Sequence, residues 1–227
     1  LTAHLANISG APTGGTADQS LLLSGYEELS ASFDPVNGGF GRAPKFPTPV
    51  KILFLLRYWK RTGSDKALQM AEQTLEAMNN GGIHDHLGGG FHRYSTDSGW
   101  LVPHFEKMLY DQALLLMAFT ESWLVTKKPL YKKTAESIIT YVTRDLSSSE
   151  GAFISAEDAD SAGGEGAYYL WTKKEMEDVL GPVDGAFAAA LFGVDPLVRC
   201  GEDRSVRAAG CAPGDVHGRS VPHGDVA

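Results

Sequence analysis

The sequence contains very little cysteine. Its two cysteines, Cys200 and Cys211, both lie near the C-terminal end, and the chain has no CxxC pair. A disulfide framework, a thiol oxidoreductase centre and a cysteine zinc site each need thiols at defined spacings. The sequence therefore argues against all three.

The chain also lacks a surplus of basic residues and any long apolar run. It has 20 Lys and Arg against 28 Asp and Glu, a formal net charge of −8. This balance disfavours nucleic acid as a partner, and no apolar stretch approaches the roughly 18 residues that a membrane span needs. Because it begins at Leu1 with no initiator Met or signal-like segment, we expect a fragment of a longer protein. Its partner is expected to be a small molecule or a protein, with no membrane.

Helix signals are frequent in the rest of the chain. Thr48 can cap a helix that has Pro49 at its first position and ends at Gly63. Thr172 and Glu175 have the spacing of a capping box. With the apolar periodicity, these signals predict helices over residues 21–33, 49–62, 65–80, 103–123, 129–142 and 172–180.

The fourth of these helices is predicted to be central. Pro103 suits a first helical position, which would place His104, Glu106 and Lys107 in the opening turn. From Met108 onward the segment is apolar almost all the way round, so we expect it to be buried on most sides. Its polar first turn should then open into a cleft.

Two short strands are predicted near the end of the helical region. Phe153-Ile154 and residues 167–171 flank an acidic loop at residues 157–165, and together they predict a small β-hairpin.

Glycine corners follow the helix pairs and suggest a repeat. Gly38-Gly39-Phe40, Gly81-Gly82-Ile83 and Gly151-Ala152-Phe153 recur at irregular spacing. Helical hairpins with buried inner helices and corners on one face predict an all-α fold, a partial (α/α)6 toroid of the six-hairpin glycosidase type with a small β-hairpin, incomplete at the C-terminus. We assign residues 1–20 to a linker or frayed end, 21–193 to the toroid and 194–227 to an atypical disordered tail.

Four motifs resemble one known family. They are GGFGRAPKFP at 38–47, GGIHDHLGGGFHRYSTD at 81–97, VPHFEKMLYDQALL at 102–115, and SAEDADS with EGAYYLW within 155–171. They resemble the spermatogenesis-associated protein 20 family, in which a thioredoxin-like domain precedes an α/α six-barrel related to N-acylglucosamine 2-epimerases and six-hairpin glycosidases.

The resemblance implies a role in carbohydrate metabolism and, in animals, in sperm development. It implies a sugar epimerase, isomerase or glycosidase-like domain, active or inactive. The alternative is a non-catalytic scaffold that serves the thioredoxin-like domain of the full-length protein. Both the cysteines of that domain and the later hairpins of the barrel are missing from this chain.

The stretch from Gly81 to Asp111 holds four of the seven histidines. His86, His92 and His104 are candidate general acids or bases, because imidazole titrates near neutrality. The competing interpretation is that each histidine anchors the glycine-rich loop. The candidate carboxylates for glycoside chemistry are Glu106, Asp111, Asp158 and Asp160.

The candidate ligand-binding residues are aromatic and basic side chains. Aromatic rings can stack on sugars, and Arg or Lys suits a hydroxyl-rich or anionic ligand, whereas core packing and ion pairing are the alternatives. The candidates are Phe40, Lys45, Phe91, Arg93, Tyr94, Lys107 and Trp171.

No resident metal or cofactor is expected. The acidic loop places Asp158, Asp160 and Gly163 as an EF-hand does, but Ala162 and Tyr169 occupy positions that need ligands. A looser divalent site and a zinc site made by His86, His92 and His104 remain minor alternatives.

Overall fold

The structure is a computed structural model that describes residues 19–194. The linker predicted at the N-terminus and the tail predicted at the C-terminus lie almost wholly outside this range. The helices are α2 (Gln19–Ser32), α3 (Pro49–Thr62), α4 (Asp65–Asn80), α5 (Leu109–Thr126), α6 (Pro129–Arg144), α7 (Lys173–Leu180) and α8 (Pro182–Phe192). The strands are β1 (Tyr94–Ser95), β2 (Pro103–His104), β3 (Lys107–Met108), β4 (Ala156–Glu157), β5 (Asp160–Ser161) and β6 (Gly164–Glu165).

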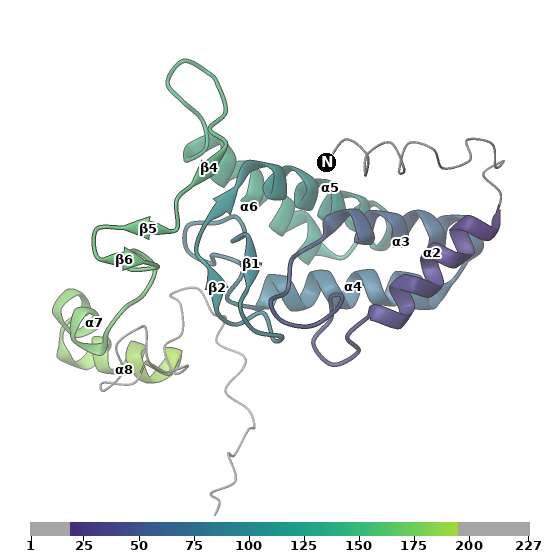
Figure 1. The fold of residues 1–227 in the computed structure, drawn as a ribbon. Coiled ribbons are helices and arrows are strands. Elements are labelled where there is room, and N and C mark those ends of the chain that lie inside the picture. Colours follow the sequence, from purple (N-terminus) through teal and green to yellow (C-terminus); the bar gives the residue numbers. More distant parts are fainter. Residues whose placement is uncertain (1–18, 195–227) are drawn as a thin grey trace, which may run out of the picture.

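Two helical hairpins form the main body. Helix α3 packs against α4, α5 packs against α6, and α3 and α5 lie side by side, with α2 along α3 (Figure 1). The shared core is apolar: Ile52, Leu55, Leu75, Phe119 and Ile138 are all 0% exposed. The predicted all-α hairpin architecture is therefore confirmed.

The helix boundaries follow the sequence signals. Helix α3 begins at Pro49, and Gly63 ends it at φ 74° with its N–H donating to the Trp59 carbonyl. The Thr172 and Glu175 capping box opens α7 as predicted. The expected cap at Thr48 is wrong, because this residue takes a left-handed conformation at φ 40° and its side chain makes no capping hydrogen bond.

The connections within the hairpins are short, and those between them are long. Only residues 63–64 join α3 to α4, and only residues 127–128 join α5 to α6. The long segments 33–48, 81–108 and 145–172 therefore emerge together at the opposite end of the helices. A bridge pairs Lys45 with Ser95, and β3 pairs with β4, so the three loops are joined to one another. The predicted convergence of the corner loops is confirmed.

The predicted start of the central helix is wrong. Residues 103–108 form β2 and β3 instead of a helical turn, because β2 pairs with β1 and β3 pairs with β4. Helix α5 begins only at Leu109, whose N–H donates to the carbonyl of Ser155 at 2.9 Å. Strand pairing with neighbouring loops satisfies the backbone groups that a helix would otherwise have used.

Helix α5 is also less buried than predicted. Tyr110, Met117 and Leu124 are 49%, 47% and 54% exposed. Their seven-residue spacing places them on one face of the helix. We call these three residues the α5 stripe.

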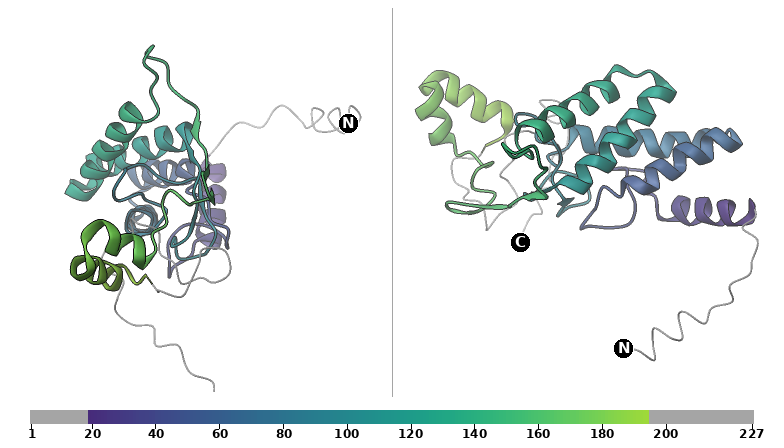
Figure 2. Two further views of the ribbon diagram at one scale, coloured as in Figure 1. Left: turned by 90° about the vertical axis from the view of Figure 1, so that its left-hand side faces the viewer. Right: turned by 90° about the horizontal axis from the view of Figure 1, so that it is seen from above.

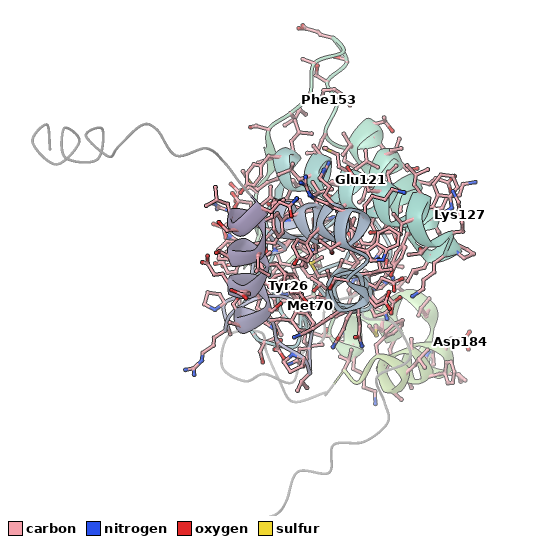
Figure 3. All side chains as sticks on the ribbon, turned by 90° about the vertical axis from the view of Figure 1, so that its right-hand side faces the viewer. Tyr26, Met70, Glu121, Lys127, Phe153 and Asp184 are labelled. Carbon is pink, nitrogen blue, oxygen red and sulfur yellow. The ribbon has the colours of Figure 1, made fainter. Side chains whose placement is uncertain are left out.

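The predicted β-hairpin lies elsewhere. Phe153 forms only an isolated bridge with Ser147 and is largely exposed on a loop that projects from the helices (Figure 3). Residues 166–169 form a turn, in which the Tyr169 N–H donates to the Gly166 carbonyl. The actual hairpin is β5 with β6, inside the acidic loop. Of the apolar side chains that suggested strands, Phe153, Ile154 and Tyr168 are exposed and Tyr169 is buried, so they do not form a ladder.

Helices α7 and α8 form a second, smaller unit. They pack against each other, with a separate cluster of Met176, Ala189 and Val194, and lie away from the two hairpins (Figure 2). Within residues 19–194, no helix combines the length and apolar character needed to cross a membrane.

Candidate functional site

Two turns at the loop end have the same backbone design. In the first, the Asp34 carboxylate accepts the N–H groups of the second and third following residues, and its carbonyl accepts the Gly38 N–H. In the second, Asp85 makes the same three bonds, the last with Gly89. The predicted glycine repeat therefore exists, but its second member is Gly89-Gly90-Phe91. The structure corrects the assignment to Gly81-Gly82-Ile83.

A buried lysine completes each turn. Lys45 Nζ lies 2.5 Å from Asp34 Oδ2 and 2.8 Å from the Gly38 carbonyl oxygen. Lys107 Nζ lies 2.7 Å from Asp85 Oδ2 and 3.0 Å from the Gly89 carbonyl oxygen. Each lysine is 1% exposed. We call these units the first and second clamps; both lysines, predicted as ligand-binding residues, are occupied in holding the loops.

The second clamp is enclosed by tyrosines. Lys107 Nζ lies 4.5 Å and 5.1 Å from the ring centres of Tyr141 and Tyr169. Both phenol hydroxyls donate to Glu157, at 2.7 Å and 3.0 Å. Burial, with Glu157 beside them, raises the pKa of each tyrosine, so both remain protonated donors.

Two of the candidate histidines form hydrogen bonds with backbone carbonyl groups of the loop. His92 is 1% exposed, its Nδ1 lies 3.0 Å from the Phe105 carbonyl oxygen, and burial lowers its pKa to about 3. His86 Nε2 lies 3.2 Å from the Gly81 carbonyl oxygen, and its ring contacts that of His84. These contacts favour the loop-anchoring interpretation for His86 and His92 over acid–base catalysis.

A polar cluster forms between the two clamps. Arg93 Nη1 lies 2.8 Å from Glu106 Oε2, His104 Nε2 lies 3.8 Å from the same oxygen, and His104 Nδ1 lies 2.5 Å from Glu165 Oε1. Pairing of β1 with β2 places His104 opposite Tyr94, and the Arg93 N–H donates to the Glu106 carbonyl. Side chains from two loops, residues 81–108 and 145–172, thus meet in this cluster.

Asp111 lies beside this cluster in the first turn of α5. It is 7% exposed, and burial raises its pKa to about 6 against the opposing effect of Arg93. Asp111 Oδ2 and Arg93 Nε are buried without a hydrogen-bond partner in the described residues. One is an acceptor and the other a donor. We call Arg93, His104, Glu106, Asp111 and Glu165 the Arg93 cluster.

The remaining candidates are dispersed. Asp158 and Asp160 are exposed, and Asp160 lies opposite Glu165 in the β5–β6 pair, at the rim of the Arg93 cluster. Trp171 packs with the α7–α8 unit, while Phe40 and Phe91 are core residues at 7% and 0% exposure. Of the predicted catalytic residues, the structure brings together His104, Glu106 and Asp111, with Arg93 and Tyr94 from the ligand-binding set.

Neither metal alternative gains support. Across residues 19–194 there is no group of three or more His, Cys, Asp or Glu side chains placed to hold an ion. His86, His92 and His104 have separate partners, as described above.

Two members of the site carry no clear signal in the sequence. Glu165 was seen only as part of an acidic loop, and Tyr110, which interacts with Arg93 and Asp111, was hidden in an apolar helix. The clamps had a visible signal, since Asp34 and Asp85 each precede a Gly-Gly-Phe by the same spacing.

Comparison with solved structures defines the class of fold. The cellobiose 2-epimerase of Bacillus thermoamylovorans B4167 matches with a TM-score of 0.53 and 17% identity, covering 62% of this chain and 42% of that enzyme. A sugar epimerase from a ruminal bacterium gives 0.51 and 17%, covering 75% and 53%. The chain is therefore part of an α/α toroid of the kind found in sugar epimerases and glycosidases. No protein-family model matches it.

Sequence relatives are more specific. Mouse spermatogenesis-associated protein 20 is 45% identical over 86% of this chain, and its human counterpart is 50% identical over 71%. The chain spans about a quarter of the length of these relatives, 26% and 22% respectively. It is therefore a homologue of part of spermatogenesis-associated protein 20.

Proposed function

We propose that the Arg93 cluster binds a carbohydrate-like ligand and moves a proton on it, as a sugar epimerase or isomerase does. The observation that carries this proposal is the pair of buried, unpartnered atoms Asp111 Oδ2 and Arg93 Nε. Buried polar atoms are normally hydrogen-bonded. A hydroxyl group both donates and accepts, so one sugar hydroxyl, or two adjacent ones, satisfies both atoms.

The electrostatics of the cluster suit proton transfer. With its pKa raised to about 6 by burial, Asp111 exchanges protons readily near neutral pH. The Arg93 guanidinium, fixed by Glu106 at 2.8 Å, offers a positive charge to an oxygen that becomes negative during the reaction. Glu165 orients His104 from the other side.

Glycoside hydrolysis is the other reaction within this class. It needs a protonated acid and an ionised carboxylate on opposite sides of the bond. Asp111 and Glu106 supply two carboxyl groups whose charges interact, as the effect of Glu106 on the Asp111 pKa indicates. However, Glu106 is already paired with Arg93, which leaves it less free to act as a nucleophile or base. We therefore place epimerisation first.

Proton exchange distinguishes these reactions. The 227-residue chain and a full-length relative are incubated with cellobiose or glucose in D2O and followed by NMR. The names of the structural neighbours motivate the choice of cellobiose. Epimerisation incorporates deuterium at carbon, whereas hydrolysis releases glucose from cellobiose without it.

Variants link any activity to the site. Arg93→Lys and Asp111→Asn are each expected to reduce exchange at least about a hundredfold, the usual range for a lost charge-stabilising donor and a lost acid–base group, respectively. Lys128→Met, on the distant α5–α6 connection, is the matched control and retains activity. If wild-type chain and relative neither bind nor turn over these sugars, the proposal is wrong.

A scaffold function is favoured by another observation, the α5 stripe, which adjoins the Arg93 cluster at Tyr110. Its three large apolar side chains are each about half exposed, and such a face suits a protein partner. In this alternative it receives the thioredoxin-like domain of the full-length protein and serves sperm development without catalysis. Met117→Glu would then abolish binding of the isolated thioredoxin-like domain in calorimetry, while Glu136→Lys, on the surface of α6, would not.

A further inference from the structure

Three rings form a ladder beside the Arg93 cluster. The Phe46 and Tyr94 ring centres are 4.9 Å apart at 32°, and those of Tyr94 and His104 are 4.9 Å apart at 18°. Tyr94 therefore has a ring on both sides. Phe46 ends the ladder, is 46% exposed, and has no further ring contact among the described residues.

The first clamp fixes the position of Phe46. Lys45 and Ser95 exchange both backbone hydrogen bonds at 2.8 Å, which makes this segment extended. Successive side chains of an extended segment point to opposite sides. Because Lys45 points into the buried clamp, Phe46 faces outward. An exposed aromatic ring held this firmly loses little entropy when a ligand stacks on it.

The ladder is continuous with the Arg93 cluster. His104 is both the last ring of the ladder and a neighbour of Glu106, which pairs with Arg93. Polar groups that fix hydroxyls at one end and an apolar ring at the other are the combination that carbohydrate sites need, because a sugar ring has a polar edge and an apolar C–H face. The Tyr94 ring separates Phe46 from His104, the ring of the ladder that belongs to the cluster. Phe46 would therefore contact a different part of the ligand.

We propose that Phe46 is the stacking platform of a second sugar subsite, so that the site takes a disaccharide or longer saccharide in preference to a monosaccharide. This inference rests on the proposed function, because it assigns the first sugar ring to the Arg93 cluster. Phe46 lies in the motif at residues 38–47 but is not one of the ligand-binding candidates predicted from the sequence.

Calorimetry on the 227-residue chain, with cellobiose and glucose as probes, tests the subsite. Phe46→Ala is expected to weaken cellobiose binding about fivefold and to leave glucose binding unchanged, the scale of one aromatic contact. Phe46→Trp keeps cellobiose affinity at or above that of the wild type. Leu87→Ala removes a side chain that is 78% exposed and forms no ring ladder, and it should alter neither affinity.

The outcomes separate the two proposals. If Arg93→Ala abolishes binding of both sugars while Phe46→Ala leaves cellobiose affinity unchanged, the platform is refuted and the proposed function stands. If Phe46→Ala weakens glucose and cellobiose equally, the second subsite is also refuted. If the wild type binds neither sugar, both proposals fail. Thermal denaturation of each variant confirms that Phe46→Ala remains folded.

Discussion

The two clamps share their backbone bonds and their Asp–Lys pair but differ in what they connect. Lys45 of the first clamp also reaches the Ser98 carbonyl at 2.9 Å and faces the Trp100 ring, so it ties the first loop to the second. Lys107 of the second clamp faces Tyr141 of α6 and Tyr169 of the third loop. One local design thus joins successive loops in sequence.

The difference shows which charged residues of this face have a structural role. The Asp34 side chain is 18% exposed and that of Asp85 is 6% exposed, so the second clamp is the more deeply buried. The Arg93 cluster lies between the clamps. The side chains of Arg93, His104, Glu106 and Glu165 are 24–50% exposed, whereas Asp111 is buried with one oxygen that has no hydrogen-bond partner among the described residues. Burial and complete pairing mark the clamps as framework, and incomplete pairing marks the cluster as the candidate site.

Replacing the lysine of each clamp tests whether the more deeply buried clamp contributes more to stability. These two substitutions should give the largest losses of unfolding free energy. Lys107→Met leaves Asp85 unpaired in the interior and is expected to cost about 3–5 kcal/mol of unfolding free energy. Lys45→Met should cost less, about 2 kcal/mol, because Asp34 keeps contact with water. Urea unfolding measures both. Equal losses would mean that burial does not distinguish the clamps.

Acid should affect the second clamp first, because only its turn is flanked by histidines. Burial lowers the pKa of His84 to about 4 and of His92 to about 3, from 6.5. The unfolded chain takes up these protons first, so stability falls as pH drops below 6.5 towards the folded values.

From pH 6.5 to pH 5, each of these histidines is expected to cost about 2 kcal/mol. His92→Gln should flatten this part of the profile of unfolding free energy against pH. As the pH falls to 5, backbone hydrogen exchange should become faster in residues 84–92 before it does in residues 33–41. Simultaneous loosening of both turns would contradict the assignment.

Each clamp has a glycine with positive φ that packs against an aromatic ring, and matched substitutions test this shared feature. A β-carbon on Gly39 would lie 2.5 Å from Trp100, and one on Gly90 would lie 2.5 Å from Tyr141, each at φ 78°. Gly39→Ala and Gly90→Ala should both cost about 2–3 kcal/mol by thermal denaturation. Gly41→Ala, at φ 81° with nothing within 4 Å, isolates the backbone strain and should cost about 1 kcal/mol. A cost for Gly41→Ala equal to that of Gly90→Ala would exclude ring contact as the cause.

The smallest expected effect concerns the open cluster between the clamps and has the opposite sign. Burial raises the pKa of Asp111 to about 6, so its charged form destabilises the fold above that pH. Asp111→Asn should therefore stabilise the protein by about 1–2 kcal/mol at pH 8, with the gain shrinking towards zero near pH 4. Asp178→Asn, in an exposed pair, should show no such trend. Destabilisation of Asp111→Asn at pH 8 would indicate a structural ion pair.

Much of the fold was predictable because its signals are local. Pro49, Gly63 and the Thr172–Glu175 capping box set helix ends through their own backbone preferences, and the structure confirms them. Pro103 carried an equally clear local signal that failed, because pairing with Tyr94 and Ser95 outweighed it. Such pairing depends on residues that only the tertiary structure brings near.

The candidate site was predictable only in part for the same reason. His104, Glu106 and Asp111 stood out as titratable groups in a glycine-rich stretch. Sequence could not show that His92, in the same stretch, lies buried against the Phe105 carbonyl, or that Glu165 reaches His104 from another loop. Residue type identifies capable side chains, whereas burial decides which of them are free to act.

The two-residue turns at Gly63-Ser64 and Lys127-Lys128 lie at the end of the helices away from all three long loops. A surface tether or a bulky reporter introduced at either turn would leave the opposite end unobstructed. If the protein were immobilised through this tether, all molecules would have the same orientation, with the loop end facing dissolved saccharides.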